Sequence, residues 1–143
     1  MSDKLDAFVD QLQEQIFDEA REVFGDEGFD RWQHPRFNKK IENPDTHARV
    51  TGSCGDTIEI SLNFVDDRVS EASYFTDGCG VSSVCGSFAA EMAIGKTVDE
   101  IADITGESIL ARLGKCPEED KHCAFLAAQT LQEAVHNYMV SGR

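Results

Sequence analysis

The sequence lacks the features that mark membrane and secreted proteins. No apolar run approaches the roughly 18 residues that a membrane-spanning helix needs. The first ten residues, MSDKLDAFVD, lack the basic-then-apolar order of a secretory signal. We therefore expect a cytoplasmic protein. A hydrophobic content of 41% is ordinary for a globular chain, so the 143 residues are expected to form one folded domain.

Basic residues are also scarce, because 13 Lys and Arg stand against 27 Asp and Glu, which gives a net charge of -14. Binding to nucleic acid needs Lys and Arg to displace counterions from phosphates, so nucleic acid is not expected as a partner. An anionic membrane surface is disfavoured for the same reason. Residues 1–30 alone hold ten acids and two bases. This balance favours a solvated helix face, and its alternative is a docking surface for a basic partner.

Helical periodicity indicates an acidic N-terminal helix within residues 1–30 that ends near Gly25. Its apolar stripe consists of Leu5, Phe8, Val9, Leu12, Ile16, Ala20, Val23 and Phe24. Residues 25–45, which contain two prolines, are expected to form an irregular loop.

The middle of the chain predicts strands and the last part predicts helices. Residues 57–64 alternate strictly between apolar and polar, 68–76 return as the second strand of a hairpin, and 47–52 fit an edge strand. Beyond Gly80 the period becomes helical, with helices expected at 81–92, at 106–113 and after Pro117. Residues 97–100 form a capping box that opens another short helix. Strands followed by helices predict an α+β fold.

Three of the five cysteines occupy positions that suit chemistry better than core packing. Cys54 and Cys79 are flanked by glycines, namely Gly55, Gly78 and Gly80, which let a backbone approach a bound metal and free its N–H groups to contact sulfur. Cys123 follows His122 in the first turn of the last helix, where the helix N-terminus stabilises a thiolate.

With Asp56, these three thiols could provide four ligands for tetrahedral zinc or for a [2Fe–2S] cluster. The sequence contains no CxxC pair, so spacing alone leaves unrelated loop thiols as an equal alternative. Cys85 lies on an apolar helical stripe and is predicted to be a buried structural thiol. Cys116 is interpreted first as a loop thiol, with a spare ligand or a resolving thiol as alternatives. His34, His47 and His136 fit surface or capping roles.

Several motifs in one order resemble IscU and the N-terminal domain of NifU, the scaffolds on which iron–sulfur clusters are assembled. The likeness extends from about residue 32 to 138. Its motifs are HPRFN at 34–38, NPD at 43–45, CGD at 54–56, TDGCG at 76–80, GKTVDE at 95–100 and HCAFL at 122–126. The resemblance implies a three-stranded antiparallel sheet packed with helices.

The resemblance also implies a cluster site made by Cys54, Asp56, Cys79 and Cys123, with His122 as an alternate ligand. Sulfur would come from a cysteine desulfurase as a persulfide on Cys123, and iron from a separate donor. The [2Fe–2S] cluster would pass to apo-proteins, so the chain would be a carrier and not an enzyme. A zinc-bound sulfur-relay protein of the SufU kind is the alternative, although the insertion typical of that branch is absent.

Two further expectations concern partners. Residues 116–120 read CPEED where bacterial IscU has an apolar and basic segment gripped by an Hsp70 chaperone. Carboxylates should be rejected by a groove that selects apolar peptides, so dependence on such a chaperone is not expected. The sequence leaves the oligomeric state open, a homodimer included.

Overall fold

The computed structural model describes residues 2–33, 36–53, 55–78, 80–114 and 116–141. Its centre is an antiparallel sheet in the order β1-β2-β3, formed by β1 (Thr46–Thr51), β2 (Thr57–Val65) and β3 (Arg68–Thr76). The expected sheet and α+β class are confirmed. The edge strand that the sequence predicted at 47–52 is β1, displaced by one residue.

The alternation in β2 gives the sheet one buried face. Ile58, Ile60 and Leu62 are fully buried, whereas Phe75 on the opposite face of β3 is 58% exposed. The turn from β2 to β3 places Asp66 and Asp67 at positive φ, 53° and 66°. Aspartate tolerates this left-handed conformation better than most residues, and two such residues in succession fit the twist of a two-residue hairpin.

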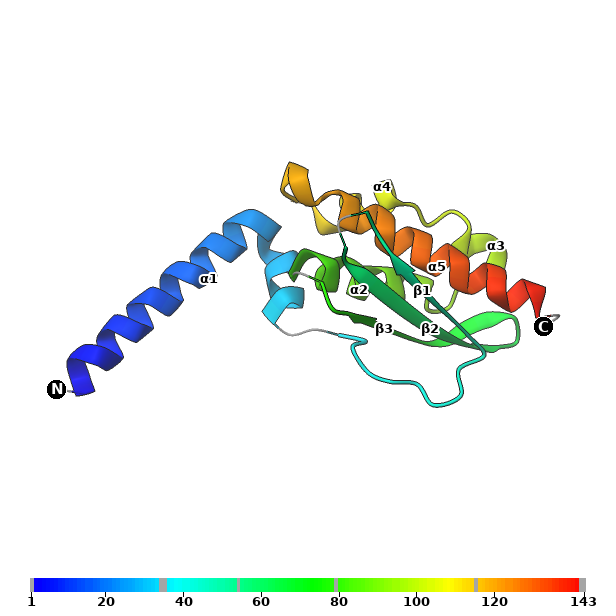
Figure 1. Ribbon diagram of the computed structural model, residues 1–143, viewed down its shortest axis with the longest axis horizontal. Coiled ribbons are helices and arrows are strands. Elements are labelled where there is room, and N and C mark those ends of the chain that lie inside the picture. Colours follow the sequence, from blue (N-terminus) through cyan, green and yellow to red (C-terminus); the bar gives the residue numbers. More distant parts are fainter. Residues whose placement is uncertain (1, 34–35, 54, 79, 115, 142–143) are drawn as a thin grey trace.

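Helices cover the buried face of the sheet, as Figure 1 shows. The long helix α5 (His122–Val140) packs mainly on β1, and α2 (Gly80–Ala93) packs on β3. Between them in sequence lie α3 (Val98–Ile101), α4 (Gly106–Leu113) and the 3-10 turn η1 (Glu118–Asp120). Among the described residues, no helix combines the length and the apolar character that a membrane span requires.

The predicted capping box at the start of α3 is present. The Thr97 side chain accepts from the Glu100 backbone N–H, and the Glu100 carboxylate accepts from the Thr97 N–H at 3.0 Å. This second bond is the main cause that holds the pKa of Glu100 below its ordinary value. Its stabilising effect is therefore present at neutral pH and is lost as the pH falls through that lowered pKa.

The N-terminal helix α1 (Ser2–Gln33) continues past the point where the sequence predicted its end. Gly25 has φ 76° and ψ 174°, so it interrupts the helix as expected, but the following residues are helical again up to Gln33. The prediction of an irregular loop from Gly25 is therefore wrong for this stretch. α1 packs against α2, and this tertiary contact stabilises the second helical segment, for which the local sequence gives no strong helical signal.

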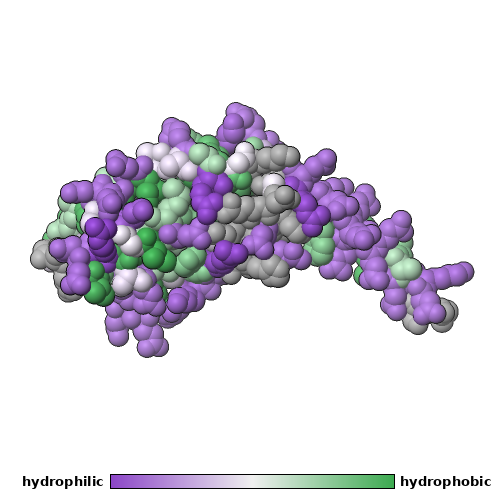
Figure 2. Space-filling view, turned by 180° about the vertical axis from the view of Figure 1, so that it is seen from behind, coloured by the Kyte–Doolittle hydropathy of each residue, from purple (hydrophilic) through white to green (hydrophobic). Residues whose placement is uncertain are grey.

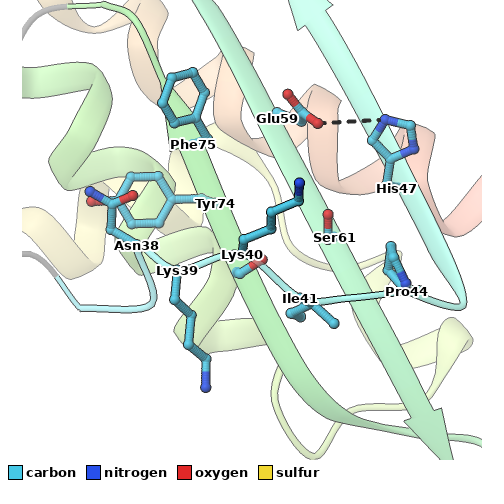
Figure 3. A pocket seen from close by; sticks show the side chains of 11 residues that line it. Asn38, Lys39, Lys40, Ile41, Pro44, His47, Glu59, Ser61, Tyr74 and Phe75 are labelled. Atoms are coloured by element: carbon cyan, nitrogen blue, oxygen red, sulfur yellow. Dashed lines mark ion pairs between the residues drawn. The ribbon is translucent and has the colours of Figure 1, made fainter.

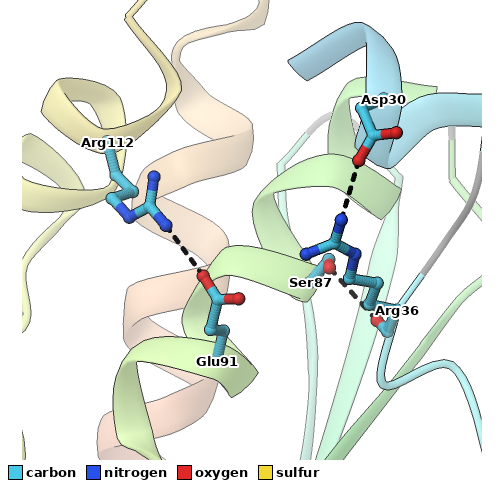
Figure 4. Close-up of polar contacts among 5 residues, drawn as sticks. All are labelled: Asp30, Arg36, Ser87, Glu91 and Arg112. Atoms are coloured by element: carbon cyan, nitrogen blue, oxygen red, sulfur yellow. Dashed lines mark hydrogen bonds and ion pairs between the residues drawn. The ribbon is translucent and has the colours of Figure 1, made fainter. Parts of the chain in front are cut away.

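Polar contacts tie the end of α1 and the helix α4 to α2 (Figure 4). The Arg36 guanidinium pairs with Asp30 at 2.9 Å, and the Arg36 carbonyl accepts from the Ser87 hydroxyl at 3.1 Å. Arg112 of α4 pairs with Glu91 at 3.0 Å. These contacts join the N-terminal segment to the same layer of helices that covers the sheet.

The loop before β1 crosses the outer face of the sheet. The Tyr74 N–H donates to the Phe37 carbonyl at 2.9 Å, which fixes the loop to β3. The loop and the sheet enclose a groove lined by Lys39, Lys40, Ile41, His47, Glu59 and Phe75, among others (Figure 3). His47 pairs there with Glu59 at 3.6 Å, which agrees with the surface role expected for this histidine.

Replacing Cys85 should test its assignment to the core, because this thiol on α2 is fully buried. The Cys85→Ser variant should lose about 1–3 kcal/mol of unfolding free energy in urea, because a hydroxyl costs more than a thiol to remove from water into the apolar core. Cys116→Ser, a change at a half-buried loop thiol, is the matched control and should cost less. Bound metal, measured by elemental analysis, should be unchanged in Cys85→Ser. A well-folded variant that had lost its metal would refute the core assignment.

Candidate metal centre

The register of the sheet brings two loops together at one end. Thr51 pairs with Thr57 across β1 and β2, and Ile58 pairs with Thr76 across β2 and β3. The loop before β2 and the loop after β3 therefore lie side by side. The Thr57 N–H donates to the Asp77 carboxylate at 3.0 Å, and the Thr76 hydroxyl donates to the Thr57 carbonyl at 2.6 Å.

Gly78 lies directly against the side chain of Asp56. A Cβ atom added at this glycine would lie 2.8 Å from Asp56 Cγ and 2.9 Å from its Oδ2. Real Cβ atoms do not approach so closely, so any larger residue at 78 would displace the carboxylate. The sequence suggested that this glycine lets the backbone approach a metal closely. In the structure the group that lies close to it is the Asp56 carboxylate.

The N-terminus of α5 adds the remaining described donors. One donor atom each from Asp56, His122 and Cys123 lies within 4.8 Å of the other two. His122 Nε2 is 3.6 Å from Cys123 Sγ. His122 is exposed, Asp56 is half-buried and Cys123 is fully buried. We call these three residues the donor group.

Ser82 links two members of the donor group. Its hydroxyl lies 2.9 Å from Asp56 Oδ2 and 3.3 Å from Cys123 Sγ. The hydroxyl is the donor in both contacts, and because it has one proton it can donate to the carboxylate or to the sulfur but not to both at once. The sequence analysis missed this residue. The feature that could have indicated its role is a serine within an apolar helical segment, three positions after the predicted ligand Cys79. This serine is fully buried in the structure.

The remaining predicted ligands, Cys54 and Cys79, lie outside the described residues, so their part in the site stays a prediction. Gly55 has φ +92°, and no described residue outside its chain neighbours has an atom within 4 Å of the position of a Cβ, so the backbone conformation favours glycine there. Gly80 is the first residue of α2. His34 also lies outside the described residues, and His136 is exposed.

Cys123 differs from the expectation in one respect. The sequence suggested a position suited to chemistry and not to core packing, but the residue is fully buried and belongs to the hydrophobic core. The reason is that the start of α5 faces α2, where the Ser82 hydroxyl lies 3.3 Å from Cys123 Sγ, and the two helices pack together. Lys121 precedes the site, and its ion pair with Glu118 at 2.7 Å raises the pKa of the lysine.

The donor set has the composition of a transition-metal site. A thiolate is a soft ligand, an imidazole is intermediate and a carboxylate is hard, and this mixture is used for zinc and for iron. Four-coordinate binding needs at least one more ligand, for which Cys54 and Cys79 have the right chemistry. The groove on the outer face of the sheet shares no residue with the donor group, so it does not mark this site.

The sequence pattern described as the NifU-like N-terminal domain matches residues 23–142. The chain belongs to this family. The match extends beyond both ends of the stretch in which the motifs showed a resemblance. The matched region therefore includes the end of α1 but leaves residues 1–22 outside.

Relatives with curated descriptions support the same family. The chain is 36% identical over 117 residues to "Iron-sulfur cluster assembly scaffold protein IscU 1" of Archaeoglobus fulgidus, a match that covers 81% of this chain and 76% of that protein. It is 32% identical over 119 residues to "Iron-sulfur cluster assembly protein IscU" of Plasmodium falciparum, covering 80% and 73%.

A solved structure agrees with the fold. The crystal structure of the N-terminal part of a NifU-like protein from Brucella abortus superposes with a TM-score of 0.66 and covers 84% of this chain and 96% of that one. The sequence identity is 17%, so this likeness concerns the fold alone.

The contact between Gly78 and Asp56 predicts the effect of a single methyl group. In Gly78→Ala the new Cβ should push the carboxylate away from Ser82 and Cys123 while the fold is kept. Affinity for Co²⁺, titrated by its visible absorption, should fall on the order of tenfold or more, as when a metal site loses an orienting contact. Ser53→Ala, at an exposed residue in the neighbouring loop, should leave the affinity unchanged. If Gly78→Ala bound Co²⁺ with the same affinity as wild type, Asp56 would not be a metal ligand whose position depends on Gly78.

Proposed function

We propose that this NifU-like domain is an iron–sulfur cluster assembly scaffold. It receives sulfur from a cysteine desulfurase and iron from a separate donor, builds a [2Fe–2S] cluster and transfers it to apo-proteins. The cluster is cargo, so the chain acts as a carrier and not as an enzyme. Cys54, Asp56, Cys79 and Cys123 hold the cluster, and His122 is an alternate ligand.

The observation that carries this proposal is the convergence of Asp56, His122 and Cys123 within 4.8 Å at the end of the sheet. These residues come from two distant parts of the chain, and the fold brings together donor types that bind iron. The relative from Archaeoglobus is described as an iron-sulfur cluster assembly scaffold protein and the one from Plasmodium as an iron-sulfur cluster assembly protein, and both descriptions support this assignment.

Sulfur transfer follows from the chemistry of Cys123. Its thiolate attacks the terminal sulfur of the desulfurase persulfide, the S–S bond of that persulfide breaks, and the desulfurase cysteine leaves as a thiolate. Release of the transferred sulfur as sulfide needs two electrons, which a thiol or another external reductant supplies. Because Cys123 is fully buried, the first turn of α5 must open when the desulfurase docks.

The second candidate function is a zinc-bound sulfur relay. A mixed oxygen, nitrogen and sulfur donor set also suits tetrahedral zinc, and the donor group has this mixture. Anaerobic reconstitution with iron, cysteine and a cysteine desulfurase, followed by Mössbauer spectroscopy, separates the two. The proposal requires a protein-bound cluster in stoichiometric yield. A colourless protein that keeps stoichiometric zinc and forms no cluster would establish the relay instead.

Cys123 should carry the transferred sulfur. After treatment with desulfurase and cysteine, mass spectrometry of alkylated peptides should find the additional sulfur on Cys123, which has the helix N-terminus and His122 beside it. Cys85→Ser serves as the control. It should carry the additional sulfur on Cys123 to the same extent as the wild-type protein, because the Cys85 thiol is in the core. Labelling of Cys54 or Cys79 with Cys123 unmodified would show that the acceptor is misassigned.

Asp56 should make the cluster easy to release. A carboxylate oxygen is a hard ligand that bonds cluster iron more weakly than a thiolate, so one such ligand favours transfer. Asp56→Ala should keep the fold and slow the decay of cluster absorbance after an apo-acceptor is added, with a thiol from solution filling the vacancy. Asp103→Ala is the matched control, since it removes an exposed carboxylate that does not belong to the donor group, and its transfer rate should equal that of wild type. Transfer as fast as wild type, or faster, would rule out this role.

A further inference from the structure

The first half of α1 projects from the rest of the molecule, as Figure 1 shows. Residues 3–16 are all exposed, and they precede the region that matches the family. Five large apolar side chains in this stretch are 47–63% exposed, namely Leu5, Phe8, Val9, Leu12 and Ile16. In the space-filling view, hydrophobic residues interrupt the hydrophilic surface of the projecting helix (Figure 2).

Four of these residues follow the spacing of a coiled-coil seam. Leu5, Val9, Leu12 and Ile16 are separated by four, three and four residues, which places the leucines at d positions and the β-branched residues at a positions. β-branched side chains at a with leucine at d are the combination that favours two parallel strands. The pattern therefore points to a paired helix and not merely to a helix with scattered apolar residues.

The charges around the seam indicate what kind of helix pairs with it. Of the four e and g positions within the seam, Phe8, Gln13 and Gln15 are uncharged and Asp6 is acidic. The acids gather on the outward b, c and f positions, namely Asp3, Asp10, Glu14 and Asp18. A basic partner would gain little from acids that point away from the seam. A second copy of this helix would meet flanks that are uncharged at three of their four positions.

The body of the protein leaves the seam open. Phe17 is half-buried, and Glu22 borders a groove with Leu110 and Cys116, so the body meets this helix at b and g positions. At their present exposure the five apolar side chains offer on the order of 500 Å² per copy, taking about 200 Å² for each large side chain. A pair that covered all five side chains completely would bury at most about 1,000 Å², which is at the lower limit for a specific interface.

We propose that α1 pairs in parallel with α1 of a second copy of this chain through Leu5, Val9, Leu12 and Ile16. Glu19 falls at the next d position and is exposed, so in a parallel pair it meets its own equivalent and ends the seam. The dimer therefore joins two scaffold domains at one end of a short coiled coil. This inference does not depend on the proposed function, because none of its residues belongs to the donor group.

Sedimentation equilibrium of the full chain over a concentration series tests the pairing. Leu12→Glu should raise the dimer dissociation constant about 100-fold, since each copy loses one buried leucine and a loss of 1.4 kcal/mol is tenfold. Gln11→Glu is the matched control, because it adds the same charge at the neighbouring outward c position and should change the constant less than about threefold. Far-ultraviolet circular dichroism confirms that both variants keep their helix.

Glu19→Leu provides a gain-of-function test that does not rely on disruption. In a parallel pair this change removes a charge repulsion and extends the seam, so dimerisation should tighten tenfold or more. A wild-type chain that stays monomeric up to about 100 μM would overturn the proposal. A dimer unaffected by Leu12→Glu would show that another surface makes it, and a dimer unaffected by Glu19→Leu would overturn the parallel arrangement.

Discussion

Hydrogen bonds around Thr57 hold the loop before β2 against the loop after β3, and the proposed site depends on this contact. Thr57 donates its N–H to Asp77 and accepts at its carbonyl from Thr76. Residues 56 and 78 are adjacent only because these bonds hold the start of β2 and the end of β3 side by side. The close approach of Gly78 to the Asp56 carboxylate is the direct consequence. A shift of register by one residue would turn the side chains of β2 to the other face and separate these groups.

The burial of Cys123 imposes a second constraint on function. A thiol in the core is protected from solvent and from oxidation, but it cannot reach a protein-bound persulfide without movement. Ser82 lies between this thiol and Asp56, so the three groups are held together before any metal arrives. The burial would suit the proposed carrier, because a site that opened only for a docked partner would keep its reactive sulfur covered at other times.

The projecting part of α1 stands apart from this chemistry. Its stability cannot come from the sheet, because residues 3–16 are exposed, and short isolated helices are only marginally stable in water. An apolar seam of this length is costly to leave in solvent. Pairing with a second copy would offset that cost and would hold two of these domains close together. The donor group by itself does not require such a pair.

Much of the fold followed from local patterns in the sequence. Strict alternation over residues 57–64 determined β2 and its buried face, two aspartates marked the hairpin turn, and the capping box marked the start of α3. Such signals are local, so they can be read without knowing the rest of the chain. The prediction failed after Gly25, where helix resumes because α1 packs on α2 and not because its sequence demands it.

The sequence by itself determined which residue types are available for metal chemistry, since glycine-flanked cysteines, Asp56 and the His122–Cys123 pair are visible in it. Only the tertiary structure decided that Asp56 and Cys123, 67 positions apart in the chain, meet at one sheet end. It also decided that Ser82 lies between them and that Cys123 is buried. The physical reason is that distances between side chains on different elements depend on strand register and on helix packing, which are set by long-range contacts that no short stretch of sequence contains.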